Sequence, residues 1–311
     1  MKLSELHIGD RFQGFYLLRN IFVKTTTTGK PFLSAVLSDN SGSLELKVWD
    51  YTGPITSADE GKVVKCAGTV QEYKGAPQAR GDAIRLATAE DSVDATQLAP
   101  SAPMDLDRAY QRLLSLVDGM TDSDYQALCR RILQRHEEQF RRIPAAKSVH
   151  HSFVGGLLMH TAYMLEIAEF LAGLYPAVIC RDLLLTGTLL HDIAKLEEFT
   201  TSPMGLVTGY STKGQLLGHL VMGAQEAAEV CRELSISEEK SVLVQHMLLS
   251  HHGQPEFGAA VVPQCAEAEL LSCIDIIDSR MEIYRETLEK TPVGEFSQRL
   301  FALDKKIYHH G

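Results

Sequence analysis

Long apolar runs are missing from this 311-residue sequence. The longest, around Leu183 to Leu190, are interrupted by Thr and Gly, so none reaches the roughly 20 residues that a membrane span needs. The N-terminal string MKLSELHIGD has no apolar core after its first charge, unlike a secretory signal. We therefore expect a cytoplasmic protein with no membrane among its partners.

Closely spaced cysteine pairs are missing as well. The six cysteines are scattered among apolar neighbours, without any Cys-x-x-Cys string. This spacing is typical of buried free thiols and argues against a disulfide scaffold or a zinc–thiolate site.

The sequence has no excess of positive charge. Its net charge of −10 argues against a protein that holds nucleic acid through charge alone. Residues 1–100 are nearly balanced, with 11 Lys or Arg against 12 Asp or Glu, whereas residues 101–311 carry a charge of −9 and 11 of the 12 histidines. Acidic residues and histidines concentrated in one part of a chain suit a metal centre, where bound cations offset the charge.

Short β-rich runs separated by turn signals make up the first ninety or so residues. The turn signals include Thr25–Lys30 and Asp39–Gly42. Short strands at this spacing favour a small barrel over a βαβ layer. The expected strands are Phe12–Val23, Phe32–Leu37, Leu44–Val48, Val63–Val70 and Ile84–Ala87.

Two strings in this part, GKPFLSAVLSDNSGSLELKVWD and GKVVKCAGTVQEYKGAPQAR, resemble an OB-fold of the nucleic-acid-binding kind. The resemblance implies an all-β OB-fold barrel over residues 1–95. Its aromatic residues either stack on bases or fill the barrel core, and its basic residues are candidates for phosphate contact. The stacking candidates are Phe32, Trp49 and Tyr73, and the basic ones are Lys74 and Arg80, with Lys30 and Lys47 beside them.

Helical periodicity replaces the strand pattern from Met104 onward. We expect a linker and leading helices over residues 96–140, then an all-α domain over residues 141–311. The helices expected in that domain are Val154–Leu174, Arg181–Phe199, Leu216–Leu234, Glu238–His252 and Ala266–Leu288.

Titratable side chains fall on the apolar faces of several of these helices. His160 lies on the stripe that contains Leu157 and Met164, and His191 lies on a face that also carries Lys195. Burial of an unpaired polar group costs about 2–7 kcal/mol, so several such groups from separate helices are best explained by a shared partner. A divalent cation held by imidazole nitrogens and carboxylate oxygens is such a partner.

The acidic face of the last helix leaves one choice open. Asp275 and Asp278 share a face within the apolar string LLSCIDIID, so spacing alone does not say which of them is the ligand.

The order His160, His191-Asp192 within LLHDIAK, and Asp275 resembles the H…HD…D signature of HD-superfamily phosphohydrolases. This resemblance favours Asp275 over Asp278. His219 in LLGHL and His251-His252 in LSHHG match the further histidines of HD members that bind two ions. The implied metal ligands are His160, His191, Asp192, His219, His251, His252 and Asp275.

The whole chain is similar to the YhaM-type 3′→5′ exoribonucleases of bacteria. The similarity rests on an OB-fold ahead of an HD domain and on the strings HHSFVGGLLMHT, LLHDIAKLEEF, GQLLGHLVMG, LSHHG and IDIIDSR. It implies single-stranded RNA as the substrate, with single-stranded DNA as an alternative, and one or two divalent ions of the manganese type. Fe, Co, Ni and Zn suit the same donors, so the sequence does not select the metal.

The implied reaction is metal-assisted hydrolysis, in which one ion activates a water and a second neutralises the phosphate and the leaving oxygen. Asp192 is expected to bridge the two ions. Lys195 either stabilises phosphate charge or pairs with Asp192 or Glu198. His151 either lines the site and touches the substrate, or makes a contact at a helix N-terminus. The candidate catalytic residues are Asp192, Lys195 and His151.

Two further features allow a nucleic-acid contact or a plain surface role. The polar loop Gly205–Gly214 carries Tyr210 and Lys213, which either contact RNA above the site or lie on the surface. A run of arginines between Arg130 and Arg142 either guides phosphates or forms a solvated helix face. Apolar helix faces suit a homo-oligomer interface as well as a core.

Two other functions compete with RNA degradation. One is a phosphohydrolase that acts on nucleotides or cyclic dinucleotides through the same pocket, although the GYP signature of cyclic-di-GMP phosphodiesterases is missing. The other is a nucleic-acid-binding protein with an OB-fold and an inactive HD domain, against which the intact set of ligands argues.

Overall fold

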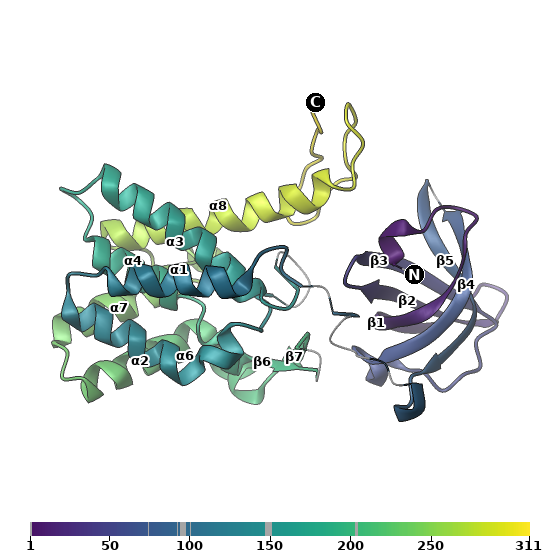
Figure 1. Cartoon of the computed structure of the whole chain (residues 1–311), viewed down its shortest axis with the longest axis horizontal. Helices are drawn as coiled ribbons and strands as arrows, with labels where there is room; N and C mark the ends of the chain where they lie inside the picture. Colours follow the sequence, from purple (N-terminus) through teal and green to yellow (C-terminus); the bar gives the residue numbers. More distant parts are fainter. Residues whose placement is uncertain are drawn as a thin grey trace. The chain divides into compact units, whose positions relative to one another are not determined.

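The computed structural model describes residues 2–73, 75–91, 93, 98–99, 101–146, 151–202 and 205–311. Lys74, a candidate for phosphate contact, lies outside the described residues. The chain forms two compact units, Met1–Ser101 with Thr201–Thr208, and Ala102–Thr200 with Gly209–Gly311. Figure 1 shows that strands build the first unit and helices the second. This confirms the expected fold class.

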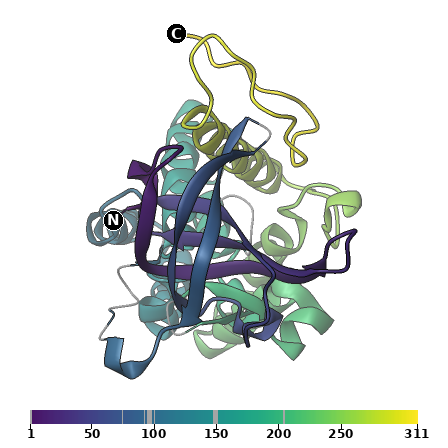
Figure 2. The same cartoon turned by 90° about the vertical axis from the view of Figure 1, so that its right-hand side faces the viewer.

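The first unit is a closed five-stranded barrel. Its strands follow the order β1-β2-β3-β5-β4, in which β3 and β5 pair in parallel and the other neighbours are antiparallel. Figure 2 shows these strands wrapping around one another. Alternate residues such as Leu33, Leu37 and Leu46 are fully buried and fill the interior, as the period of two in a strand requires. The strands are β1 (Arg11–Thr25), β2 (Pro31–Asp39), β3 (Gly42–Trp49), β4 (Val63–Tyr73) and β5 (Ala76–Leu86).

The second unit is a helical domain. A short β-ribbon has residues in both units, because Thr201–Thr208 belong to the first. The ribbon pairs β6 (Phe199–Thr201) with β7 (Val207–Tyr210) and is an exception to the expected all-α pattern. The helices α1 and α2, which the sequence placed with the linker, belong to this unit. The helices are α1 (Leu106–Asp118), α2 (Ser123–Phe140), α3 (Gly156–Leu174), α4 (Arg181–Leu190), α5 (Lys195–Glu198), α6 (Thr212–Glu233), α7 (Glu238–Ser250) and α8 (Ala266–Leu288).

The helix expected from Arg181 to Phe199 is interrupted at its middle. α4 ends at Leu190, and α5 begins only at Lys195. Between them the amides of Ile193 and Lys195 donate to carbonyls three residues back, at 3.1 and 3.0 Å. Such tight turns redirect the chain, so the histidine–aspartate pair lies at a bend and not on a straight helix.

α6 also departs from the expected helix. It begins at Thr212, because the Ser211 hydroxyl accepts a hydrogen bond from the Gly214 amide at 2.9 Å and caps the helix. It is then broken at Gly218, whose φ of 72° and ψ of 160° only glycine adopts without strain. His219 is therefore the first residue after a break in the helix.

α3 is the central apolar helix of this unit. By length and composition it is the one helix among the described residues that could cross a membrane, but half of its apolar window is buried within the protein. The core helix of a soluble protein meets the same criteria. Its face toward the centre carries His160, which is 2% exposed.

Candidate metal centre

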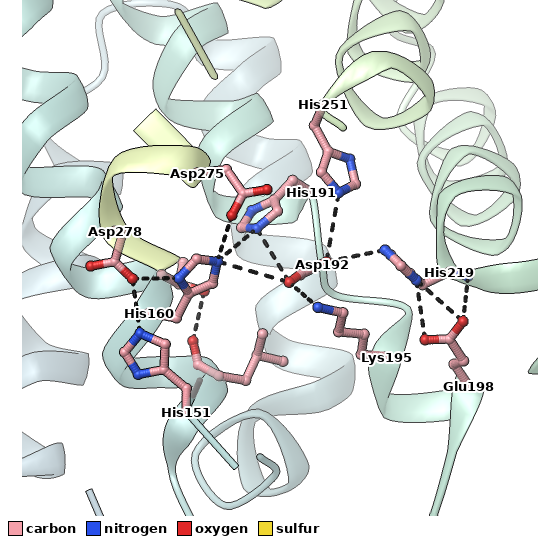
Figure 3. A network of polar contacts seen from close by, with 12 residues as sticks. His151, His160, His191, Asp192, Lys195, Glu198, His219, His251, Asp275 and Asp278 are labelled. Atoms are coloured by element: carbon pink, nitrogen blue, oxygen red, sulfur yellow. Dashed lines mark hydrogen bonds and ion pairs between the residues drawn. The ribbon is translucent and has the colours of Figure 1, made fainter. Parts of the chain in front are cut away.

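All seven predicted metal ligands belong to the helical unit, where they come from five separate segments of chain. His160 projects from α3 and Asp275 from α8, while the remaining ligands lie where helices end or break. Figure 3 shows the side chains of His160, His191, His219 and His251 around Asp192. The segments at helix ends contribute His191 and Asp192 after α4, His219 after the break in α6, and His251 and His252 after α7.

Asp192 separates the ligands into two groups, because its two oxygens face different histidines. Oδ2 lies 3.3 Å from His191 Nε2 and 3.9 Å from His160 Nε2. Oδ1 lies 3.3 Å from His219 Nε2 and 3.7 Å from His251 Nε2. A carboxylate with one oxygen in each group can bridge two cations.

The first group also includes Asp275. Donor atoms of His160, His191 and Asp275 lie within 4.8 Å of one another. The Nε2 atoms of His160 and His191 are only 3.3 Å apart. Both rings donate through Nδ1, so in the neutral state two lone pairs would face each other. That arrangement is unfavourable unless a cation or a proton lies between them.

The second group contains buried nitrogen and oxygen atoms that make no hydrogen bond. Asp192 Oδ1, His219 Nε2, His251 Nε2 and His252 Nδ1 are buried and make no hydrogen bond within the described part of the chain. Donor atoms of the three histidines also lie within 4.8 Å of one another. A buried polar atom without a partner costs about 1–3 kcal/mol, so four that converge fit a divalent cation.

The positions of His191 and His251 at helix ends fix which nitrogen each ring presents. The last carbonyls of a helix have no intrahelical partner. His191 Nδ1 donates to the carbonyl of Thr188 and His251 Nδ1 donates to that of Leu248, both at 2.8 Å. The proton therefore resides on Nδ1, and each Nε2 keeps its lone pair for a metal ion.

Glu198 fixes which ring nitrogen of His219 carries the proton. Its carboxylate accepts from the His219 backbone amide at 3.1 Å and from Nδ1 at 3.1 Å. The sequence suggested Glu198 only as a partner for Lys195 and did not predict that it would orient a ligand. A carboxylate behind a metal-binding histidine fixes the ring and raises its basicity.

The structure distinguishes the two aspartates of α8. Asp275 Oδ1 faces His160 Nε2 at 3.4 Å, on the metal side of the ring. Asp278 Oδ2 accepts from His160 Nδ1 at 2.6 Å, on the opposite side. This geometry favours Asp275 as the ligand and gives Asp278 the orienting role.

His151 lies behind the ligands, not among them. Its ring is fully buried, and its Nε2 donates to Asp278 Oδ2 at 2.9 Å. In this position it supports the carboxylate that orients His160. The predicted contact between His151 and a substrate stays a prediction.

The electrostatics of the centre keep its carboxylates ionised. Burial would raise the pKa of Asp278, but hydrogen bonds from His151 and His160 hold it at about 2. Burial likewise opposes ionisation of Asp192, yet Lys195 and the adjacent histidines lower its pKa well below the usual range. The pKa of His160 is raised. Burial would lower it, but hydrogen bonds to Asp275 and Asp278 outweigh burial and bring it to about 9.

Lys195 forms an ion pair with Asp192, which was one of the two roles predicted for it. Its Nζ lies 2.5 Å from Asp192 Oδ2, and its side chain is 14% exposed. Burial would lower the pKa of Lys195, but the charge of Asp192 raises it. The lysine thus stays protonated beside the carboxylate that both ligand groups share.

In the barrel unit, the stacking candidates on β2 and β3 lie outside the core. Phe32 pairs in register with Trp49, and their ring centroids are 5.0 Å apart. Trp49 is 47% exposed. On the same outward face, Lys47 pairs in register with Arg80 of β5. Tyr73, at the end of β4, is 52% exposed.

Two residues predicted to contact RNA lie at the end of β7 and the start of α6. Tyr210 packs against Phe199, with ring centroids 5.4 Å apart, and remains 46% exposed. Lys213 forms an ion pair with Glu197 at 2.7 Å. Tyr210 thus keeps an exposed ring, whereas the charge of Lys213 already has a partner.

The arginine run on α2 is paired with acidic residues. Arg130 contacts Asp118 at 2.6 Å, and Arg135 contacts Glu233 at 2.6 Å. These ion pairs offset the charges that would attract phosphates. The geometry therefore favours a solvated helix face.

Comparison with known proteins independently supports the HD signature and the relationship to exoribonucleases. Residues 157–280 match the HD domain family, and residues 101–174 match a family described as a putative helicase. The 3′-5′ exoribonuclease YhaM of Listeria monocytogenes is 36% identical over 314 residues, which cover 99% of this chain and 98% of that protein. The protein of the same name from Oceanobacillus iheyensis is 37% identical over 305 residues, 97% of this chain and 94% of that one.

Among solved structures, the second OB-fold domain of replication protein A from Methanococcus maripaludis is 18% identical. The match covers 30% of this chain and 98% of that domain, with a TM-score of 0.24. The strand order of the closed barrel, β1-β2-β3-β5-β4, is that of an OB-fold. The HD match contains all seven predicted ligands, and the relatives extend over both units. The chain therefore belongs to the YhaM family of 3′-5′ exoribonucleases.

Proposed function

We propose that this protein is a metal-dependent 3′-5′ exoribonuclease that hydrolyses single-stranded RNA. The observation that carries the proposal is the position of Asp192. Its two oxygens face two separate groups of histidine nitrogens, as a carboxylate bridging two divalent ions requires. Nucleases are among the enzymes that use paired metal ions, which stabilise both the attacking and the leaving oxygen.

His160, His191 and Asp275 would hold the first ion, His219, His251 and His252 the second, and Asp192 both. When bound, divalent ions stabilise the charge of the phosphate and of the leaving oxygen and lower the pKa of water. Mixed imidazole and carboxylate donors suit Mn²⁺ among several divalent metals, so we take Mn²⁺ as the first ion to test.

Residues behind the ligands keep the centre organised. Asp278 accepts the Nδ1 proton of His160, and Glu198 accepts that of His219, so each ring presents Nε2 toward the centre. Lys195 keeps Asp192 ionised and places a positive charge beside the position of the phosphate.

The barrel would bind the substrate upstream of the reacting end. The Phe32–Trp49 pair, in which Trp49 is exposed and Phe32 is partly buried, offers ring faces to unpaired bases, and Lys47 and Arg80 offer charge to phosphates. Base stacking on such rings does not depend on sequence and requires single strands. This favours RNA strands without secondary structure, with single-stranded DNA as the alternative.

Incubation of 5′-labelled single-stranded RNA with the protein and Mn²⁺ tests the proposal. We expect products that shorten one nucleotide at a time from the 3′ end, and loss of this activity in His191→Ala and Asp192→Ala. Arg130→Ala, on an exposed ion pair, is the matched control. Rapid hydrolysis of mononucleotides or cyclic dinucleotides with RNA left intact would overturn the proposal, as would RNA binding without cleavage.

A further inference from the structure

Large apolar side chains are exposed next to two histidines of the second ligand group. Leu216 is 78% exposed and Leu217 is 43% exposed, in the turn of α6 that precedes His219. Phe257, a few residues beyond His252, is 72% exposed. Isolated apolar residues on a surface need no explanation, but these lie beside the proposed reaction centre.

The leucines lie close to the centre because the chain is anchored there. Consecutive Cα atoms are about 3.8 Å apart, so the Cα of Leu216 is at most about 11 Å from that of His219. Glu198 holds the His219 amide and ring, and the Ser211 cap holds the start of α6. The leucines are therefore part of a fixed turn on this side of the centre.

Phe257 is placed by its neighbour Gly258. A Cβ atom on Gly258 would lie 3.2 Å from His252 Nδ1, so the backbone at this position rests against the histidine ring. The amide of Ala260 donates to the carbonyl of Leu249 at 3.0 Å and folds the segment back on the end of α7. Phe257 is thus one residue away from a direct contact with a candidate metal ligand.

Positive charge near the second group is already paired. Lys195 contacts Asp192 at 2.5 Å, and Lys213 contacts Glu197 at 2.7 Å. Beside the exposed polar residues of these segments, Leu216, Leu217 and Phe257 give this side an apolar surface. A phosphate gains little there away from the ions, whereas the flat face of a base gains van der Waals contact and loses water.

We propose that Leu216, Leu217 and Phe257 form a subsite for the nucleobase of the 3′-terminal nucleotide. The inference rests on the proposed function: when the scissile phosphate lies at the ions, the terminal base is only one sugar away. Apolar contact with a base face is non-directional, so the subsite accepts all four bases and places the last phosphodiester at the centre.

Steady-state kinetics on two substrates test this subsite. They are a single-stranded RNA and the same RNA with an abasic 3′-terminal residue. We expect Phe257→Ala and Leu216→Ala each to raise KM for the ordinary RNA about ten-fold, in line with stacking energies. Phe257→Trp, which keeps an aromatic face, should retain a low KM.

The abasic RNA distinguishes base contact from a general defect. The KM of the unaltered protein for the abasic RNA should be about ten-fold higher than its KM for the ordinary RNA. Neither alanine variant should raise the KM for the abasic RNA further. Phe170→Ala is the control, because Phe170 is 65% exposed and lies about 15 Å along α3 from His160. An equal loss on ordinary and abasic RNA, or no loss at all, would overturn the subsite. Failure of the unaltered protein to shorten RNA would overturn the proposed function itself.

Discussion

At the scale of single residues, the metal centre depends on where its histidines lie relative to helix ends. His191 and His251 each follow the last residue of a helix, where an unpaired carbonyl three residues back accepts the Nδ1 proton. The helix end thus selects the tautomer, and no extra side chain is needed. His219 lies at the start of a helical segment instead, where amides and not carbonyls are unpaired, so it requires the carboxylate of Glu198.

Glu198→Ala should therefore weaken the second ion more than the first. Loss of an orienting partner commonly lowers metal affinity by 10–100-fold. We expect the Mn²⁺ concentration for half-maximal RNA hydrolysis to rise by about that factor, with activity recovering at high Mn²⁺. Isothermal titration should show one weakened site beside one unchanged site.

The neighbouring residue provides the control. Glu197→Ala removes an acid whose side chain is 51% exposed and which contacts Lys213, so the Mn²⁺ dependence should stay the same. An equal weakening in both variants would indicate a general effect of charge and would contradict the orienting role of Glu198.

The convergence of the candidate ligands could be predicted from the sequence, whereas the residues behind them could not. His160, His191, Asp192 and Asp275 follow a characteristic order, and a titratable group on an apolar stripe is visible in one dimension. The roles of Glu198 and Asp278 depend on which side of an imidazole ring they approach. That side is set by a helix break at Gly218 and by the rotation of α8, which no spacing rule gives.

At the scale of elements, α4 matters because it carries the histidine–aspartate pair at its end. Its start is fixed by Asp182, which is 5% exposed. The carboxylate accepts from the amides of Thr121 and Asp122, both at 2.8 Å, and from the Thr121 hydroxyl at 2.9 Å. The loop between α1 and α2 is thereby bound to the helix that positions His191.

Asp182→Asn should destabilise the folded protein by about 2–3 kcal/mol at neutral pH, because hydrogen bonds to an ionised acceptor are lost. Burial would raise the pKa of Asp182, but the hydrogen bonds from Asp122 and Thr121 lower it below its usual 3.8. The ionised group therefore stabilises the fold above about pH 4, and this contribution is lost as the pH falls through the folded pKa.

Urea unfolding of both proteins between about pH 7 and about pH 3 measures the difference, which should shrink toward the acidic end. Asp118→Asn is the control, since its ion pair with Arg130 is exposed on both sides and should contribute less than about 1 kcal/mol. A difference that grows on acidification would show that Asp182 is not stabilised as an anion.

The elements themselves were predicted where local pattern decides and missed where tertiary contacts decide. All five barrel strands were expected, because turn residues separate runs rich in apolar residues. The last was expected only at Ile84–Ala87, however, whereas β5 begins at Ala76. The break between α4 and α5 was not expected, because LLHDIAKLEEF keeps helical spacing throughout. The short ribbon of β6 and β7 was missed too, since such short strands have too few residues to show a period.

At the scale of the whole molecule, the barrel part and the helical part differ in their charge. The barrel part is nearly neutral and presents an aromatic pair with Lys47 and Arg80, whereas the helical part holds most of the negative charge and the metal ligands. Because such a barrel has little net positive charge, we expect stacking of bases on its aromatic rings to supply much of its affinity. Its contribution should therefore depend on the number of unpaired bases that a substrate offers.

Phe32→Ala and Trp49→Ala should each raise KM about ten-fold for a single-stranded RNA of about 20 nucleotides, the range expected for loss of one stacked base. The same changes should leave kcat unaltered, because these residues lie in the barrel and not at the metal ligands. For a dinucleotide, both of whose nucleotides are taken up at the reaction centre, KM should not change.

Raising the salt concentration separates stacking from attraction by charge. Binding through phosphates weakens steeply with salt, whereas the penalty of Trp49→Ala should stay nearly constant because stacking is not ionic. Tyr175→Ala, at a residue that is 53% exposed in the helical unit, serves as the control and should match the unaltered protein on both substrates. If Trp49→Ala raised KM equally for the dinucleotide and the long RNA, the barrel face would not be the surface that holds the upstream strand, and the aromatic pair would have a structural role.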